Sequence, residues 1–435
     1  MHAILTPVGS SGDVNPFVTI GRELRRRGHD VTVLAAEPFA GVVSNAGLAF
    51  VSTWSAEDYA HITSHPDLWH PSRGIGLVLQ AVASGLRSAY AAIRQVHEPG
   101  RTIVVGHTLA LVTRVFEEVH RVPAATVHLA PNVFRSDFRQ PALAPARDIS
   151  WWPRQVKRAL WWGVDRVLID PHITPALNRW RAELGLPPVS RVFNTWLHSP
   201  QRTIGLFPDW FADPQPDWPV QSRLSGFVLS DAPVAPALTD SESPARTRLT
   251  DDESRDSLDA FIAGGPAPIV FTAGSANRQA RRFFSTAIEA SARTGLRAVL
   301  VTGYREHLPT VLPGHVYHAG YAPFTALFPR AAAIVHHGGI GTCAQGFAAG
   351  VPQLVMPMGF DQPDNAWRVA TLGAGETIAP SAFTPRRVSK ALDRLLSSER
   401  ILAACREWQQ RIRAEDPVKH ACDLLEETYD RNKRS

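Results

Sequence analysis

Histidine, glycine and threonine are concentrated in one short stretch, HHGGIGT, which runs over residues 336–342. The apolar run that ends at His336 predicts a buried strand, and the residues from Gly341 onward predict a helix. Glycines such as Gly338 and Gly341 let a ligand approach the backbone closely. A helix N-terminus adds unpaired N–H groups and the positive end of the helix dipole. With the Thr342 hydroxyl as a further donor, the stretch predicts a phosphate-binding turn.

Two other interpretations of this stretch remain open. It could be only a tight strand-to-helix turn with a packed histidine. A metal-binding pair is disfavoured, because the two rings diverge and no nearby Cys or His completes a ligand set. Since adjacent residues leaving a strand point in opposite directions, only one of His336 and His337 is expected to face a ligand.

A second polar pair follows the next predicted strand, over residues 353–356, where the chain turns into another helix at Asp361 and Gln362. A carboxylate beside a carboxamide offers acceptors and donors suited to neighbouring sugar hydroxyls. The alternative is an ordinary helix N-cap by Asp361.

A third candidate is the carboxylate of Asp13, in the sequence GSSGD that follows a predicted strand over residues 4–8. We expect Gly12 and Asp13 in a loop at the carboxyl end of that strand, where Asp13 could take a proton from an attacking hydroxyl as a general base. Alternatively, Asp13 only caps the next helix or supports the loop. The helix signals place the N-cap at Asn15 and the first helical position at Pro16.

Parallel sheets are needed to position these turns. Strand, loop, helix and strand follow one another over residues 4–35, which is a βαβ unit. The same order restarts at residue 269, with further strands predicted over 298–301 and 333–336. We therefore expect an α/β fold of two doubly wound domains with ligands bound in a cleft at the carboxyl ends of the strands. The predicted boundaries are 1–230 for the first domain, 231–256 for a linker rich in Pro, Ser, Thr and charge, 257–415 for the second domain and 416–435 for a helical tail.

The composition describes an ordinary globular protein of 435 residues, 44% hydrophobic and 20% charged. The net charge of +5 is spread along the chain without a basic stripe, so a nucleic-acid partner is not expected. Three cysteines do not make a disulfide framework. The N-terminus does not read as a signal peptide, and no apolar run reaches membrane-spanning length. A cytoplasmic protein is the expectation, with peripheral association at the inner membrane face left open and the oligomeric state undetermined.

Taken together, HHGGIGT, AAGVPQLVMP, DQPDNA and LGAG resemble the donor-binding motif of nucleotide-sugar glycosyltransferases with the GT-B fold. That family includes antibiotic glycosyltransferases, sterol glucosyltransferases and UDP-glycosyltransferases. GSSGDVNPF is similar to the loop that opens the acceptor domain in the same enzymes. WLHSPQ and LFPDWFADPQPDWP, over 196–201 and 206–219, make the rhamnosyltransferase of rhamnolipid synthesis the nearest resemblance. The resemblance implies two Rossmann-like domains, an acceptor-binding one followed by a donor-binding one.

The resemblance also implies roles for particular residues. It matches His336 to the contact with the donor diphosphate and Asp361 with Gln362 to the contacts with sugar hydroxyls. Asp13 stands where many relatives carry the histidine base, so an inverting transfer is implied. A glutamate that holds the ribose in plant relatives is replaced by Ala344. The remaining donor-side matches are Gly338, Gly341 and Thr342 at the phosphates, Gly274 and Ser275 in a loop against the donor, and Tyr321 as a ring against the nucleobase.

The acceptor side is less clearly marked. Residues 151–168 combine four tryptophans with four basic residues, and apolar side chains recur at helical spacing. This segment could be a wall for a lipophilic acceptor, a surface against anionic membrane, or simply core. The candidate acceptor contacts are Gly12, His107, His128, Trp151 and Trp152, although a lone histidine at a strand end is commonly structural.

The sequence thus predicts a glycosyltransferase that moves a hexose, glucose or rhamnose, from a UDP- or dTDP-sugar to a hydroxyl of a lipophilic small molecule. No D-x-D motif is present, so neither a metal nor another cofactor is expected. Two alternatives are a non-catalytic nucleotide or lipid binder on the same fold and an NAD-dependent oxidoreductase. The latter needs G-x-G-x-x-G, and the first turn offers only Gly9 and Gly12.

Overall fold

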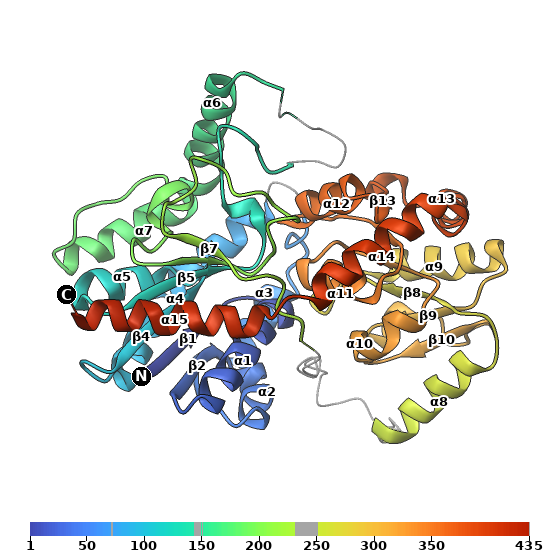
Figure 1. The fold of residues 1–435 in the computed structure, drawn as a ribbon, viewed down its shortest axis with the longest axis horizontal. Coiled ribbons are helices and arrows are strands. Elements are labelled where there is room, and N and C mark those ends of the chain that lie inside the picture. The colour runs from blue at the N-terminus through green and yellow to red at the C-terminus, as the bar shows by residue number, and fades with distance from the viewer. Residues whose placement is uncertain (71–72, 143–148, 150, 231–250, 435) are drawn as a thin grey trace. The chain divides into compact units, whose positions relative to one another are not determined.

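The computed structural model describes residues 1–70, 73–142, 149, 151–230 and 251–434. These residues form two compact units, each built on a parallel sheet (Figure 1). The first unit comprises Met1–Ser230, Gly359–Asp364 and Glu415–Ser435, and the second comprises Asp231–Met358 and Asn365–Ala414. The GT-B architecture of two doubly wound α/β domains therefore agrees with the predicted fold class.

The sheet of the first unit has the order β3-β2-β1-β4-β5-β6-β7, with every neighbouring pair parallel. The inner strands β1, β4 and β5, and also β6, are buried at every position because helices cover the sheet, whereas β3 and β7 at its two edges are partly exposed. The described strands are β1 His2–Thr6, β2 Asp30–Ala36, β3 Ala49–Trp54, β4 Thr102–His107, β5 Ala124–His128, β6 Thr203–Gly205 and β7 Ser222–Leu224. The described α-helices are α1 Ser11–Arg26, α2 Ala40–Asn45, α3 Ala56–Thr63, α4 Gly74–Val96, α5 Leu111–His120, α6 Arg154–Val164, α7 Asp170–Glu183 and α15 Pro417–Arg434.

The sheet of the second unit has the order β10-β9-β8-β11-β12-β13 and is also parallel throughout. Its described strands are β8 Ile269–Thr272, β9 Ala298–Val301, β10 Val316–Ala319, β11 Ala333–His336, β12 Gln353–Val355 and β13 Gly375–Thr377. Its described helices are α8 Asp251–Ala263, α9 Arg281–Thr294, α10 Phe324–Leu327, α11 Ile340–Ala349, α12 Gln362–Thr371 (from Asn365 onward), α13 Pro385–Ser397 and α14 Glu399–Arg413. The strands predicted over 269–272, 298–301 and 333–336 have these same bounds.

The first helix begins one turn earlier than predicted. α1 starts at Ser11 with Ser10 as its N-cap, and Pro16 lies inside the helix. The cause is a capping box, in which Ser10 and Asp13 satisfy each other's backbone donors. The prediction of an N-cap at Asn15 is therefore wrong, and Asp13 belongs to the first helical turn instead of a loop.

The C-terminal helix α15 packs beside α1 in the first unit (Figure 1). Arg27 at the end of α1 makes ion pairs of 2.7 Å with Asp423 and 2.8 Å with Glu426. The tail that the sequence set apart as 416–435 thus belongs to this unit. Residues 231–250 of the predicted linker lie outside the described residues, and residues from 251 onward already form α8.

One described helix, α4, has the length and apolar composition of a membrane span, which the sequence had not led us to expect. Leu79, Leu86 and Ile93 of this 23-residue helix are buried and pack into the core of the first unit. The helix is therefore explained as one that covers the sheet.

Candidate functional site

His336 is part of the core of the second unit. It is the last residue of β11 and is fully buried, with an exposed fraction of 0%. Its Nδ1 accepts the Gly338 amide at 3.1 Å, so Nε2 carries the proton and donates to Gln353 Oε1 at 3.0 Å. Because both ring nitrogens are engaged inside the unit, His336 is not free to contact a diphosphate, and we correct that assignment.

His337 has the opposite environment. Its Nδ1 is buried but has no hydrogen-bond partner among the described residues. A Cβ added to Gly274 or Gly339 would lie 2.7 Å or 2.6 Å from ring atoms of His337, so the ring is held between two glycines. Burial lowers the pKa of His337 to about 4, so the ring is neutral at physiological pH. An orphaned nitrogen of this kind is costly unless a ligand completes it.

The first turn of α11 follows directly. Gly339 is its N-cap, and the first hydrogen bond within the helix is from the Cys343 amide to the Gly339 carbonyl at 3.0 Å. The amides from residue 340 to 342 precede that bond and have no acceptor in the helix. Gly341 is exposed, and a Cβ there would meet no protein atom within 4 Å. Protein packing therefore does not require this glycine, whereas a ligand seated on the amides would.

Two buried amide side chains hold this turn in place. Asn365 donates to the Gly338 carbonyl at 2.9 Å, and Gln353 donates to the Cys343 carbonyl at 3.3 Å while accepting from His336. Gly338 itself has φ +90, a conformation that favours glycine. Sequence reasoning missed Gln353 and Asn365, because neither belongs to a recognisable local pattern.

The other predicted donor residues of the second unit lie at the same edge of its sheet, after the carboxyl ends of strands. Gly274 has φ +86 and, as described above, packs on His337 rather than facing open space. Ser275 is exposed, and its carbonyl accepts the Tyr304 hydroxyl at 3.3 Å. Tyr321 follows β10 and is 39% exposed. These positions are compatible with a donor site, and the roles remain predictions.

Asp361 and Gln362 stand at the start of α12, in the short segment Gly359–Asp364 that belongs to the first unit. Gln362 is buried, and its carbonyl oxygen accepts the Gly359 amide at 3.3 Å. Asp361 is half-buried. Phe360, just before them, has φ +58, and its ring packs edge-on to Trp69 with centroids 5.6 Å apart. The structure confirms the turn into a helix and leaves sugar binding as a prediction.

Neighbouring residues of the first unit hold the carboxylate of Asp13 in place. Its Oδ2 accepts the Ser10 amide at 2.6 Å and the Ser10 hydroxyl at 3.0 Å. Gly9 has φ +137, and a Cβ there would lie 2.2 Å from Oδ2, so only glycine leaves room for the carboxylate. Asp13 thus caps α1 through Oδ2, Oδ1 is still available for other contacts, and the role of general base remains a prediction.

His107, at the end of β4, faces that second oxygen. Its Nε2 lies 3.6 Å from Asp13 Oδ1. Its Nδ1 accepts the Leu109 amide at 3.3 Å, so Nε2 carries the proton on the side of Asp13. Burial lowers the pKa of His107, partly opposed by the Asp13 charge. His107 was predicted as an acceptor contact, and the structure places it as a neighbour of Asp13.

The remaining acceptor candidates are distributed differently. His128 is fully buried and bonded to Thr108 Oγ1 at 2.9 Å and to His198 Nδ1 at 3.0 Å, so it is a structural histidine and the prediction is wrong. Gly12 is exposed in the first turn of α1. Trp151 is 79% exposed and Trp152 half-buried. The interpretation of this segment as core is wrong for Trp151.

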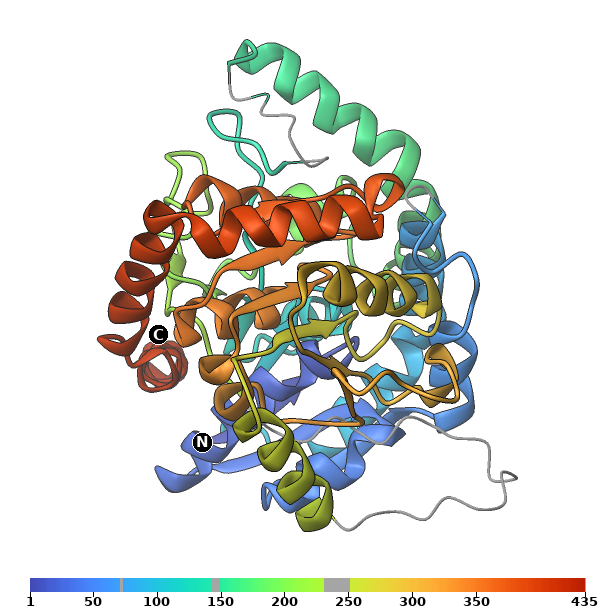
Figure 2. The ribbon, with the colours of Figure 1, turned by 90° about the vertical axis from the view of Figure 1, so that its right-hand side faces the viewer.

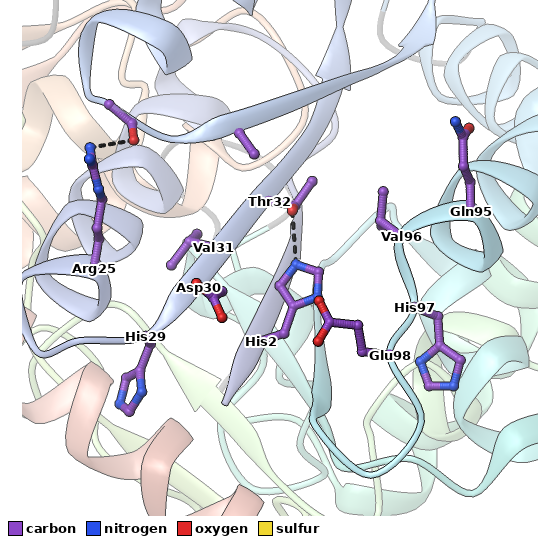
Figure 3. Close-up of a pocket in the computed structure, with 12 residues that line it drawn as sticks. His2, Arg25, His29, Asp30, Val31, Thr32, Gln95, Val96, His97 and Glu98 are labelled. Atoms are coloured by element: carbon purple, nitrogen blue, oxygen red, sulfur yellow. Dashed lines mark hydrogen bonds and ion pairs between the residues drawn. The ribbon is translucent and has the colours of Figure 1, made fainter.

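A cavity of about 530 Å³ in the first unit lies elsewhere (Figure 3). It is lined at the amino ends of β1, β2 and β3, where the His2 ring is bonded to the Thr32 hydroxyl at 2.9 Å and lies 3.3 Å from Glu98. Ligands of doubly wound sheets bind at the opposite, carboxyl ends. The cavity is therefore separate from the predicted site, and no group of three or more His, Cys, Asp or Glu suited to a metal occurs in the described part of the chain.

Two doubly wound parallel sheets, with a glycine-rich strand-to-helix turn in the second unit, define the GT-B class. Solved structures agree on the fold. The glycotransferase of kitacinnamycin matches 98% of this chain and 99% of its own, with 21% identity and a TM-score of 0.70. The spinosyn rhamnosyltransferase SpnG in complex with thymidine diphosphate matches 98% and 100%, with 17% identity and a TM-score of 0.66.

Sequence relatives show the family. O-mycaminosyltylonolide 6-deoxyallosyltransferase of Streptomyces fradiae is 30% identical over 98% of this chain and 97% of its own length. Sterol 3-beta-glucosyltransferase of Candida albicans is 25% identical over 98% of this chain and 28% of its own. Residues 297–421 match the family described as erythromycin biosynthesis protein CIII-like, C-terminal domain. The chain belongs to the nucleotide-sugar glycosyltransferases, and the oxidoreductase alternative is thereby discarded.

Proposed function

We propose that this glycosyltransferase moves a 6-deoxyhexose from a dTDP-sugar to a hydroxyl of a lipophilic natural product, with inversion at the anomeric carbon. The proposed donor site rests on one observation: the buried Nδ1 of His337, which has no hydrogen-bond partner in the described part of the chain, lies beside the open first turn of α11. Two names support dTDP and a deoxysugar, because one relative is a 6-deoxyallosyltransferase and a structural neighbour was solved with thymidine diphosphate; the sterol 3-beta-glucosyltransferase is named for glucose instead.

The diphosphate would be held by neutral donors. The amides of the first turn of α11, the Thr342 hydroxyl and an N–H of His337 supply hydrogen bonds, and the helix dipole opposes the negative charge. These groups strengthen their interactions as charge develops on the leaving dTDP, which is how preorganised donors lower a barrier. The sequence has no D-x-D motif, so we propose that these donors carry out the step without a metal.

Asp13 would act as the general base. As the acceptor oxygen attacks the anomeric carbon, its proton passes to Oδ1 of Asp13, and the bond from that carbon to the diphosphate oxygen breaks. Attack opposite the leaving group inverts the configuration. Ser10 and Gly9 fix the carboxylate through Oδ2, and the Nε2–H of His107 faces Oδ1, so the base is held in one orientation. A carboxylate held in this one orientation would accept a proton from an acceptor hydroxyl in one position.

Replacing Asp13 by Asn tests this proposal. Asn keeps an oxygen that accepts the Ser10 amide, so the cap and the fold of the first unit should survive. The expected result is unchanged dTDP affinity and a transfer rate roughly 10²–10⁴-fold lower. Product is measured by mass spectrometry with dTDP-rhamnose, dTDP-glucose and UDP-glucose against a panel of macrolide, sterol and hydroxy fatty acid acceptors.

Two outcomes would count against the proposal. Persistent turnover in the Asn variant would remove Asp13 as the base. Nucleotide binding by the unmodified protein without transfer from any donor would favour the alternative of a non-catalytic binder.

A further inference from the structure

Helix α6 and its flanking residues present apolar side chains to solvent. In the described part of the chain, large exposed hydrophobic residues are few, and the segment 151–168 holds half of those recorded. They are Trp151 at 79%, Val156 at 45%, Trp162 at 56%, Val167 at 66% and Leu168 at 39% exposed. Scattered apolar residues on a surface need no explanation, but a contiguous group of this kind marks a binding surface.

The exposed group lies on one side of the helix. Val156, Ala159, Trp162 and Gly163 fall at helical spacing and are exposed or half-buried, while the buried side holds Lys157 and Trp161. Trp161 is fixed under the guanidinium of Arg135, 4.3 Å from its ring centre, so α6 is anchored to its unit through that side. Both views show α6, the green helix at the top, extending away from the sheet of its unit (Figures 1 and 2).

The charges around this apolar stripe are almost all positive. Arg154, Arg158 and Arg166 are exposed, with Arg158 paired to Asp137 outside the segment, and the segment itself has a single acidic residue, Asp165. Asp165 is 1% exposed and is bound by Arg135 and Arg191, so it presents no charge to a partner. Arg166 makes no ion pair among the described residues, and the guanidinium of Arg154 lies over the ring of Phe138.

We propose that this surface, α6 with Trp151, Val167 and Leu168, docks the protein on an anionic lipid bilayer. Tryptophan is favoured where an apolar medium meets water, and arginine side chains reach lipid phosphates from beside an apolar stripe. A second copy of this chain fits less well. A twofold contact through the same surface would bring arginines against arginines, with no exposed acid on the stripe to pair with them.

Vesicle co-sedimentation with the full chain tests the inference. The protein is mixed with vesicles of phosphatidylcholine alone or with one third phosphatidylglycerol, at low and high salt. We expect binding to the anionic vesicles only, weakened by salt. The double variants Trp162→Ser with Val167→Ser, and Arg154→Glu with Arg166→Glu, should each lower binding at least about tenfold. For the arginine pair this follows because each basic residue near such a surface contributes roughly fivefold to binding.

Matched controls are available on other surfaces. Val220 and Val311 are 90% and 82% exposed, and Arg400 and Arg406 are exposed basic residues without ion pairs among the described residues. Val220→Ser with Val311→Ser, and Arg400→Glu with Arg406→Glu, should bind as the unmodified protein does. Equal binding to both vesicle types, no binding to either, or equal losses in the controls would overturn the inference. A dimer in sedimentation velocity that the α6 variants dissociate would replace it by an interface between copies.

Discussion

The two adjacent histidines of the β11–α11 turn should respond in opposite ways to the same substitution. His337→Leu removes a buried nitrogen that has no hydrogen-bond partner among the described residues, so the protein without ligand should lose no hydrogen bond. Leaving such a group unpaired costs about 1–3 kcal/mol, and the variant should be as stable as the parent or up to that much more stable. His336→Leu instead deprives the Gly338 amide and Gln353 of their partner. Two buried groups become unsatisfied, so we expect the free energy of unfolding to fall by about 2–5 kcal/mol.

Nucleotide binding should show the reverse order. A hydrogen bond to a charged group contributes about 1.5–3 kcal/mol, so His337→Leu should raise the Kd for dTDP by roughly 10- to 150-fold. Binding is measured by isothermal titration calorimetry and stability by urea unfolding, on both variants and the parent. The reasoning is refuted if His337→Leu keeps its dTDP affinity, or if it destabilises the protein as much as His336→Leu does.

Three further predictions concern the two turns and the buried imidazoles. Gly9→Ala places a Cβ against Asp13 Oδ2 and requires a left-handed φ, so we expect transfer to fall sharply and stability to drop by about 1–3 kcal/mol while dTDP binding is retained; wild-type transfer rates would contradict this. Gly341→Asp puts a carboxylate into open space at the first turn of α11, which should abolish dTDP binding without lowering the melting temperature; undiminished binding would show that the nucleotide sits elsewhere. Burial lowers the pKa of His336 to about 3 and that of His198 to about 4. Below about pH 6.5 these two imidazoles therefore bind protons in the unfolded chain but not in the folded one. Stability should be full above that pH and decline towards pH 4 by roughly 1 kcal/mol per unit for each ring, and urea midpoints that stay constant from pH 7 to 5 would disprove it.

Much of the second unit could be predicted because its strands are short, continuous apolar runs bounded by glycine or proline. Ile269–Thr272 and Ala333–His336 are buried at every position, which is typical of a parallel sheet covered on both faces. The same continuous burial is the reason why the sequence did not distinguish the roles of His336 and His337. Since β11 is buried on both sides, the sequence carries no alternation that indicates which of two consecutive histidines faces the core.

The errors in the first unit have two origins, a local capping box that the prediction overlooked and contacts between segments far apart in the sequence. The start of α1 depends on a box between Ser10 and Asp13, and Gly9 explains it only once its steric contact with the carboxylate is known. Helix α15 joins the first unit through ion pairs between Arg27 and residues about 400 positions away. His107 and Asp13 lie on different strands' turns, and only the parallel pairing of β1 with β4 brings them together.

Hydrogen–deuterium exchange of the peptide spanning residues 336–345, with and without dTDP, tests the central claim most directly. The account predicts that dTDP slows exchange at the amides of the first turn of α11, that NAD does not, and that the protection is lost in His337→Leu. Unchanged exchange in this peptide at a dTDP concentration that saturates binding would contradict the placement of the donor diphosphate at α11.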